Sequence, residues 1–409
     1  MNDEEYGILV LRPLGGDPEG PSAIDVGKAM RDGRRRRRRW WTGGSTLAAV
    51  LVAALTGGVL VATQQTPRPG PDLPPDPVLP AACTAGPLPT GPHESAEVSG
   101  GDPSGAWLVG MSDAHLPTPP VSHSVLLWHN GELVADVRPR DVRKGSPGVR
   151  MNDVNGSGVA VGSDPRGNSD PWVLENGEVR KLAGAPGEAN AINDAGVIAG
   201  RSGPPGQRRP VRWTSPDAEP TPLPVPAGLG NVQPTVTDIA PDGTIIGEIG
   251  GRAYLWWPDG TSGYVGLPTV EGRKADGFLP MAFSHGWLYG TLFLPMAEPS
   301  PAGFLGGEAR DTPIYRYDLR SRIWQKLADW QMETQVAGTF HGQFMAAEPK
   351  VFVGRQVLSL PAYPAPIMDG TANFLIENVS DDARTVAGTA LSGVADPSKP
   401  AVPVIWRCR

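Results

Sequence analysis

The chain has 409 residues and a formal net charge of −7, and 19% of its residues are charged. This composition argues against a disordered polyelectrolyte and against a nucleic-acid-binding protein, which would be basic. Its two cysteines exclude a disulfide-rich small scaffold and a zinc module built on several cysteines. Glycine and proline make up about a quarter of the chain, which is near the composition of low-complexity sequence unless a repeat organises it.

The N-terminal residues 1–42 are too few to bury a core of their own. Ser22–Asp25 resembles a capping box and predicts a short helix over about residues 22–33, within a head that is otherwise disordered. This head is a candidate docking site for a cytosolic partner. Its sequence around Ile24–Gly33 also resembles the juxtamembrane heads of single-span actinobacterial proteins, a resemblance that implies no chemistry.

Residues 43–63 are apolar and uncharged, and they are long enough to cross a bilayer as one α-helix. Trp40 and Trp41 precede this segment, as is typical of a membrane interface, and a basic run precedes them. The run consists of Arg34, Arg35, Arg36, Arg37, Arg38 and Arg39. Arginine on this side predicts a single-pass protein of the cell membrane, with a cytoplasmic N-terminus and an extracellular C-terminal domain. Cleavage of the segment as a signal peptide is an open alternative.

Residues 64–82 form a predicted extracellular linker. Half of the positions from Pro67 to Pro80 are proline, which favours an extended polyproline II conformation. Such a linker would hold the following domain away from the membrane surface.

Residues 83–409 contain a repeat whose clearest element is a pair of glycines separated by three residues. It occurs at Gly158–Gly162, Gly196–Gly200, Gly243–Gly247 and Gly286–Gly290, with looser copies at 105–110, 342–346 and 384–388. The closing positions are 110, 162, 200, 247, 290, 346 and 388, on average about 46 residues apart.

Each repeat also carries a strand with an aromatic residue near its end, and several carry a hairpin turn. The turn pairs Asn130-Gly131, Asn176-Gly177 and Asp259-Gly260 tolerate the positive φ angles that tight hairpins require. Four short strands in each of seven repeats predict an all-β fold, a seven-bladed β-propeller of four-stranded blades preceded by one transmembrane α-helix. Six or eight blades are the open alternatives. The surplus of tryptophan, 12 residues, fits flat side chains that fill the space between blades.

The two ends of the array complement one another. The last repeat ends at Arg409 without a fourth strand, whereas Cys83–Leu88 precedes the first repeat and has no blade of its own. If Cys83–Leu88 joins the last blade, the ring closes without an open edge, and Cys83 and Cys408 lie on adjacent strands. We therefore predict a disulfide between them, as expected in an oxidising exterior; the alternative is two free thiols.

Two of the repeated elements resemble those of bacterial extracellular HAF-type repeat proteins. Ile192–Gly200 is similar to the Ile-Asn-Asp strand of that family, and Ser124–Gly131 is similar to its second element, without the His-Ala-Phe triplet. The resemblance implies a secreted or membrane-anchored propeller and no defined activity.

The sequence contains no nucleophile elbow, Walker A motif, H-E-x-x-H or C-x-x-C. We therefore predict no catalytic residue, no metal site and no cofactor, and we assign no binding residue.

Polar residues that recur or cluster are interpreted as loop and turn residues: His115, His123, His129, Asp164, Asn168, Asp170, His285 and His341. Asp153, Asp194 and Asp242 recur at matching turns, where they would bond their own backbone; a ring of carboxylates in the central channel is the alternative. The longer segments 114–121 and 296–312 are predicted binding loops.

Three functions are compatible with these observations. The first is a non-enzymatic binding, sensing or interaction module held in the cell envelope, with an unknown extracellular ligand or protein partner. The second is a propeller hydrolase or lyase acting on an extracellular glycan or small ester. The third is a signalling protein that couples the outer domain to the cytoplasmic head. The absence of catalytic motifs favours the first.

Overall fold

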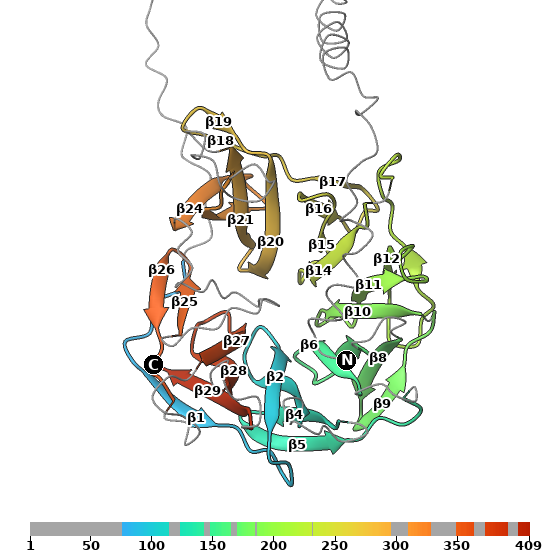
Figure 1. Cartoon of the computed structure of the whole chain (residues 1–409), viewed down its shortest axis with the longest axis vertical. Helices are drawn as coiled ribbons and strands as arrows, with labels where there is room; N and C mark the ends of the chain where they lie inside the picture. Colours follow the sequence, from blue (N-terminus) through green and yellow to red (C-terminus); the bar gives the residue numbers. More distant parts are fainter. Residues whose placement is uncertain are drawn as a thin grey trace, which may run out of the picture. The chain divides into compact units, whose positions relative to one another are not determined.

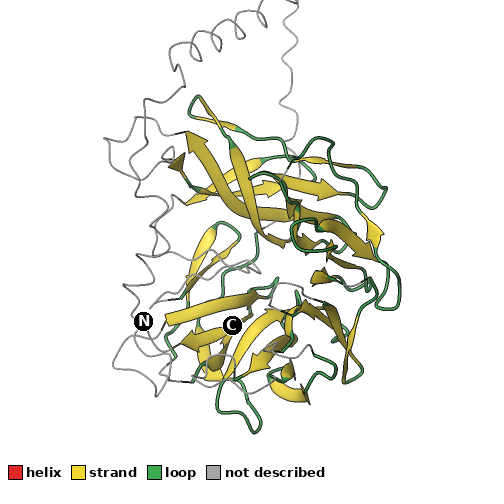
Figure 2. Ribbon diagram, turned by 45° about the vertical axis from the view of Figure 1, so that its right-hand side comes forward, coloured by secondary structure: helices red, strands yellow, loops and turns green. Residues whose placement is uncertain are grey.

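The computed structural model describes ten stretches of the chain, all within a compact unit that begins at Pro69. They are residues 76–113, 123–142, 148–164, 170–184, 186–230, 232–295, 310–328, 349–363, 373–391 and 400–409. All regular elements in these stretches are strands (Figure 2), and none is a helix that could span a membrane. The transmembrane helix included in the predicted fold is therefore absent from the described architecture. The segment 43–63, the six arginines before it and the predicted short helix lie outside the described residues.

The strands of the described residues form six antiparallel blades arranged in a ring (Figure 1). Blade 1 consists of β2 (Ala96–Gly101), β3 (Trp107–Ser112), β4 (Val125–His129) and β5 (Glu132–Val137). Blade 2 consists of β6 (Arg150–Val154), β7 (Ala160–Ser163), β8 (Pro171–Glu175) and β9 (Glu178–Lys181). Blade 3 consists of β10 (Gly187–Ile192), β11 (Ile198–Ser202), β12 (Arg209–Trp213) and β13 (Thr221–Pro222).

The other three blades complete the ring. Blade 4 consists of β14 (Thr235–Ile239), β15 (Ile245–Glu248), β16 (Ala253–Trp256) and β17 (Ser262–Tyr264). Blade 5 consists of β20 (Gly277–Ser284), β21 (Trp287–Pro295), β23 (Ile314–Asp318) and β24 (Trp324–Ala328), with β22 (Arg310–Asp311) paired to β21. Blade 6 consists of β27 (Asn373–Val379), β28 (Thr385–Leu391), β29 (Val402–Cys408) and β1 (Cys83–Pro87). The first strand of each blade in chain order, which for blade 6 is β27, lies innermost (Figure 1).

The described residues form six blades, so the prediction of seven blades is wrong for this part of the chain, whereas the all-β propeller class is confirmed. Between blades 5 and 6 the described residues form only a two-stranded hairpin, β25 (Lys350–Val353) with β26 (Gln356–Ser359). A second small hairpin, β18 (Thr269–Val270) with β19 (Arg273–Lys274), precedes blade 5. At the inner side of the ring, blades 5 and 6 touch directly, because the Ser284 hydroxyl donates a 2.7 Å hydrogen bond to the Asp381 carboxylate.

A β-bulge in the innermost strand of every blade explains why the repeat closes on glycine. At the bulge one extra residue is inserted, which pushes the innermost strand against the second strand. A Cβ atom on the facing residue of the second strand would lie far inside van der Waals contact with a backbone carbonyl oxygen of the innermost strand. The facing residues are Gly110, Gly162, Gly200, Gly247, Gly290 and Gly388, six of the seven closing positions. The seventh closing position carries Ala346, which lies outside the described residues.

Adding a methyl group at a closing glycine should destabilise the fold. We expect Gly200→Ala to lower the free energy of unfolding by about 1–3 kcal/mol, because the backbone oxygen of Glu188 must move to admit a Cβ. Gly86→Ala is the matched control in strand β1, where a Cβ meets no atom within 4 Å. Urea unfolding of both variants measures the difference, and equal stability of the two would contradict this account.

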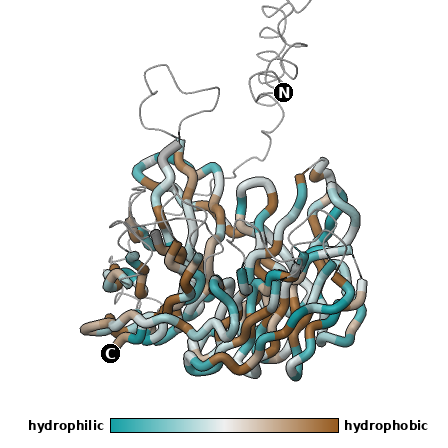
Figure 3. The backbone as a smooth tube through the Cα atoms, turned by 60° about the horizontal axis from the view of Figure 1, so that its bottom comes forward, coloured by the Kyte–Doolittle hydropathy of each residue, from teal (hydrophilic) through white to brown (hydrophobic). Residues whose placement is uncertain are grey.

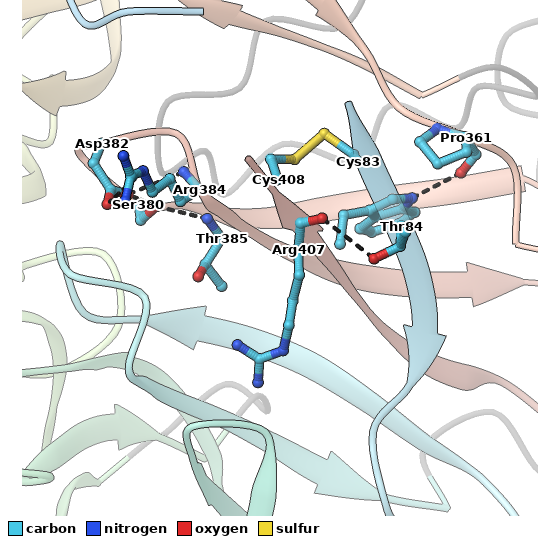
Figure 4. Close-up of a disulfide and its surroundings, with 10 residues drawn as sticks. Cys83, Thr84, Pro361, Ser380, Asp382, Arg384, Thr385, Arg407 and Cys408 are labelled. Carbon is cyan, nitrogen blue, oxygen red and sulfur yellow. Dashed lines mark hydrogen bonds and ion pairs between the residues drawn. A yellow bond between two sulfur atoms is a disulfide. The ribbon is translucent and has the colours of Figure 1, made fainter. Parts of the chain in front are cut away.

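The ring closes as the sequence predicted. Strand β1 pairs with β29 in an antiparallel register that places Cys83 opposite Cys408. The two cysteines form a disulfide (Figure 4). Beyond it, Arg409 and Ala82 exchange backbone hydrogen bonds. The outer strand of blade 6 therefore comes from the start of the domain and its other three strands from the end.

Part of the predicted linker is bound to the propeller. Asp76 lies against blade 5 and the β25–β26 hairpin, where its carboxylate pairs with Arg316 at 2.5 Å and with Arg355 at 2.9 Å. Arg316 is almost fully buried, and its guanidinium lies over the Trp287 ring, 4.0 Å from the centroid. Residue Leu79 packs against the core of blade 6. The ordered contacts of the propeller thus begin before Cys83.

Tryptophans near the ends of the third strands form hydrogen bonds to neighbouring parts of the ring. The large number of tryptophans had suggested such a position between blades. Each indole is buried and donates its N–H to a backbone carbonyl just after a neighbouring strand. The pairs are Trp128 to Pro89 at 2.7 Å, Trp213 to Ala183 at 3.0 Å, Trp256 to Pro224 at 2.6 Å and Trp406 to Pro361 at 2.8 Å. For the first three pairs this is the outer strand of the preceding blade, and for Trp406 it is β26 of the hairpin. Apolar segments accordingly recur around the whole ring (Figure 3) instead of forming one central core.

Candidate functional site

A cavity of about 430 Å³ lies at one end of the innermost strands. Its wall combines the ends of these strands with the turns that follow them, and it draws residues from all six blades. Each of the six innermost strands contributes to this wall, for example through Gly100, Asp153, Ile192, Asp238, Phe283 and Glu377. Because every blade supplies the same structural position, the cavity lies where the blades converge.

The bulged residues fix this wall by hydrogen bonds from blade to blade. The Ser99 hydroxyl donates to the Met151 carbonyl at 2.6 Å, the Asn152 amide to the Ala189 carbonyl at 2.9 Å and the Asn190 amide to the Val236 carbonyl at 2.7 Å. In each pair the acceptor directly precedes the bulged residue of the next blade. Side chains held in this way give this part of the cavity a preorganised surface.

Asp153 and Asp238 occupy equivalent positions in blades 2 and 4. Asp153 accepts backbone hydrogen bonds from Ile192 at 2.7 Å, in the next blade, and from Val154 at 2.8 Å. Burial raises the pKa of Asp153 well above its ordinary value, and the nearby Asp238 raises it further. Burial also raises the pKa of Asp238, to about 7, although hydrogen bonds from Ile239 and Phe283 oppose the shift.

Glu377 is the bulged residue of blade 6, and its side chain has an oxygen without a partner. The residue is 8% exposed and lines the cavity. Its Oε1 lies 3.5 Å from Nη2 of Arg150, whereas its Oε2 has no hydrogen-bond partner among the described residues. Burial raises the pKa of Glu377 to about 8; Arg150 opposes this shift and Glu97 reinforces it.

These raised pKa values predict that the fold loses stability as pH rises. Above about pH 4.5 the unfolded chain releases the Glu377 proton, whereas the folded chain keeps it up to about pH 8. The free energy of unfolding therefore falls across this window by at most about 1.4 kcal/mol per pH unit for each such group. Asp153 and Asp238 act in the same direction.

Urea midpoints measured at several values across this pH window test the sign. We expect Glu377→Gln to show a shallower decline than the unaltered protein, because glutamine does not titrate. Glu178→Gln on the outer strand β9, where the side chain is exposed, is the matched control and should keep the full slope. A stability that rises over this range would contradict the assignment.

The recurring turn carboxylates have different partners in the structure. Asp242 accepts the backbone N–H of Thr244 at 2.8 Å, as predicted for a turn residue, but Asp194 accepts that of Gly156 in the neighbouring blade at 2.8 Å. Asp153 lies in strand β6 and not in a turn. All three line the cavity, so a local backbone bond such as that of Asp242 occurs together with the gathering of carboxylates that was the alternative.

The predicted loop histidines have separate environments. His129 stacks on Trp107 with ring centroids 4.1 Å apart, whereas His123 is buried and is not a surface-loop residue. His285 occupies a turn with positive φ, as expected, and lies at the cavity rim, 3.6 Å from Asp381. His115, His341, Asn168 and the binding loops 114–121 and 296–309 lie outside the described residues.

The acidic loop does not gather metal ligands in the described part of the chain. Asp164 is buried, and Asp170 pairs with Lys181 at 2.6 Å. No group of three or more His, Cys, Asp or Glu side chains is placed to hold a metal ion among the residues that the structure describes.

Comparison with known proteins identifies no family and no activity. No family model and no curated protein sequence matches the chain. Among solved structures, TolB from Acinetobacter baumannii is 10% identical with a TM-score of 0.38, covering 75% of this chain and 65% of TolB. A prolyl endopeptidase is 11% identical with a TM-score of 0.48, covering 77% of this chain and 50% of the endopeptidase. A gluconolactonase from Xanthomonas campestris is 13% identical with a TM-score of 0.37, covering 83% and 97%. The chain is a β-propeller, and these similarities extend to its fold alone.

Proposed function

We propose that this protein is a membrane-attached, extracytoplasmic binding module whose inner cavity takes up a small ligand without transforming it. The cavity is the observation that supports this function. Its volume, about 430 Å³, lies in the range of small-ligand sites, and its wall combines apolar surface with converging polar groups. Three of the six bulged residues, in blades 1 to 3, hold the wall by hydrogen bonds from blade to blade.

The location outside the cytoplasm is part of the proposal. The apolar segment 43–63 and the preceding arginines favour attachment with the propeller on the outer side. The Cys83–Cys408 disulfide is consistent with an oxidising compartment. A reporter that is active only outside the cytoplasm, fused after Arg409, should be active, and a signal only from a cytoplasmic reporter would overturn the location.

The binding role is tested with the full chain in detergent. Thermal shift and calorimetry against a panel of cationic, neutral and anionic small molecules and short peptides should reveal ligands that bind in the cavity. The same protein is then incubated with glycans, esters and lactones. Binding without turnover supports the proposal. Turnover that is lost on substituting Asp153 or Asp238 would instead establish an enzyme.

A further inference from the structure

The chemistry of the cavity wall restricts the ligand that it can hold, if the proposed binding function is correct. Seven of its lining residues carry carboxyl groups, whereas Arg320 and His285 are its basic residues. An anionic ligand would be repelled by each of these carboxyl groups that is ionised. Electrostatic complementarity therefore favours a cation.

Six of the seven carboxyl groups already accept hydrogen bonds from the protein. Asp153 and Asp238 bind backbone N–H groups within the wall, and Asp381 accepts the Ser284 hydroxyl. The turn residues Asp194 and Asp242, and Asp318 at the end of β23, accept backbone N–H groups as well. Glu377 differs, because its Oε2 has no partner among the described residues although the residue is more than nine-tenths buried. A buried acceptor without a donor is costly, and a ligand that donates to it would remove this cost.

The remainder of the wall is apolar. The apolar residues that line the cavity beside the carboxyl groups include Ala191, Ile192, Ile239, Phe283 and Leu319. Sugars commonly stack on exposed aromatic rings, and Phe283 is the aromatic residue among the lining residues. This surface suits an aliphatic chain better than a neutral glycan.

We infer that the cavity binds a small organic cation, a guanidinium or ammonium group on a short aliphatic chain, with the Glu377 carboxylate as its charged contact. The cation is either a free small molecule or the side chain of an arginine or lysine in a peptide. Both sources present the same group. Oε2 is enclosed in the ligand-free structure, so the Glu377 carboxylate must turn toward the cavity to meet the cation, while Arg150 keeps its place beside Oε1.

Binding should be coupled to loss of a proton. Glu377 faces Arg150 from β6 and Glu97 from β2, and Asp153, Asp238, Asp381 and His285 face the same cavity. A cation favours the ionised carboxylate, so binding to the protonated form requires the Glu377 proton to leave for solvent. The affinity for a cation that does not itself titrate should therefore rise as pH increases toward the raised pKa of Glu377.

Calorimetry with the full chain tests this inference with probes that differ in charge and little in shape. N-butylguanidinium is compared with N-butylurea, and a capped Ala-Arg-Ala peptide with its citrulline counterpart. We expect each guanidinium probe to bind about tenfold or more tightly than its urea counterpart, and the affinity to rise between about pH 6 and about pH 8. Comparing the two guanidinium probes distinguishes a free cation from a peptide side chain.

Glu377→Gln should weaken guanidinium binding about 30-fold and flatten its pH dependence, because the amide cannot carry the negative charge. The matched control Glu178→Gln, on the outer strand β9, should bind as the unaltered protein does. If Glu377→Gln fails to fold, charge selectivity and pH dependence of the unaltered protein still decide the question. If the urea probes bind as tightly as the guanidinium probes, the inference that the cavity selects a cation is wrong, and the proposed binding function still stands. A full panel without any ligand would overturn the proposed function itself.

Discussion

Replacing Cys83 and Cys408 by serine should lower the free energy of unfolding by about 5 kcal/mol. The disulfide closes a loop with a sequence separation of 325 residues, and in the chain-entropy model the stabilisation grows with the length of the closed loop. The two cysteines face one another across the β1–β29 pair, so the bond joins the first strand of the propeller to its last. Without it, β1 is held only by its backbone pairing and by packing.

Urea unfolding of the double variant, compared with the oxidised and the reduced unaltered protein, measures this effect. The reduced protein should match the double variant, because both lack the crosslink and keep the same pairing of strands. Two single variants, Cys83→Ser and Cys408→Ser, should each lose the same amount as the double variant. A double variant as stable as the oxidised protein would contradict this assignment.

Removing the Asp76 carboxylate should cost about 3 kcal/mol of unfolding free energy. Arg316, whose side chain is 2% exposed, would keep its buried charge without an anion at 2.5 Å. Burial alone would raise the pKa of Asp76, but hydrogen bonds from Arg316 and Arg355 hold it below its ordinary value. The stabilisation should therefore persist at neutral pH and be lost as acid protonates the carboxylate.

Asp76→Ala is compared with Arg355→Ala, which removes the other partner of the same carboxylate. Because the Arg355 side chain is 65% exposed, its loss should cost about 0.5 kcal/mol or less. Combining Asp76→Ala with Arg316→Met removes both buried charges and should recover part of the loss. Similar effects of Asp76→Ala and Arg355→Ala on the urea midpoint would refute the buried ion pair.

The propeller class and the closing strand could be predicted because their signals are local. Hairpin turn pairs and closing glycines recur along the sequence, and the unpaired ends of the array contain the two cysteines. The number of blades could not be predicted, because it was inferred only from the number of closing positions in the repeat. The closing position at 346 is alanine, whereas the other six are glycine. At those six positions the bulge leaves no room for a Cβ atom, so an alanine does not match the pattern of the blades.

The candidate site was largely beyond sequence reasoning. Asp153 and Asp238 have the same role only because equivalent positions in different blades converge, and their raised pKa values come from burial. Glu377 lies in a strand without a glycine or turn motif, so only its position at the bulge of β27 marks it. The register of the bulged strands was the missing information, and it is a property of pairing between strands.

The position of the disulfide in the register has a mechanical consequence. A pull on the chain before Cys83 would reach β1 at its first residue, where antiparallel pairing with β29 begins. Strands loaded at one end separate like a zipper, one pair after another. The Cys83–Cys408 bond lies at the pair where this separation would start, so tension is carried by a covalent bond into β29. Before it arrives there, the tension must break the ion pairs of Asp76. The propeller can thus be held by its N-terminal segment under load while its ring stays closed.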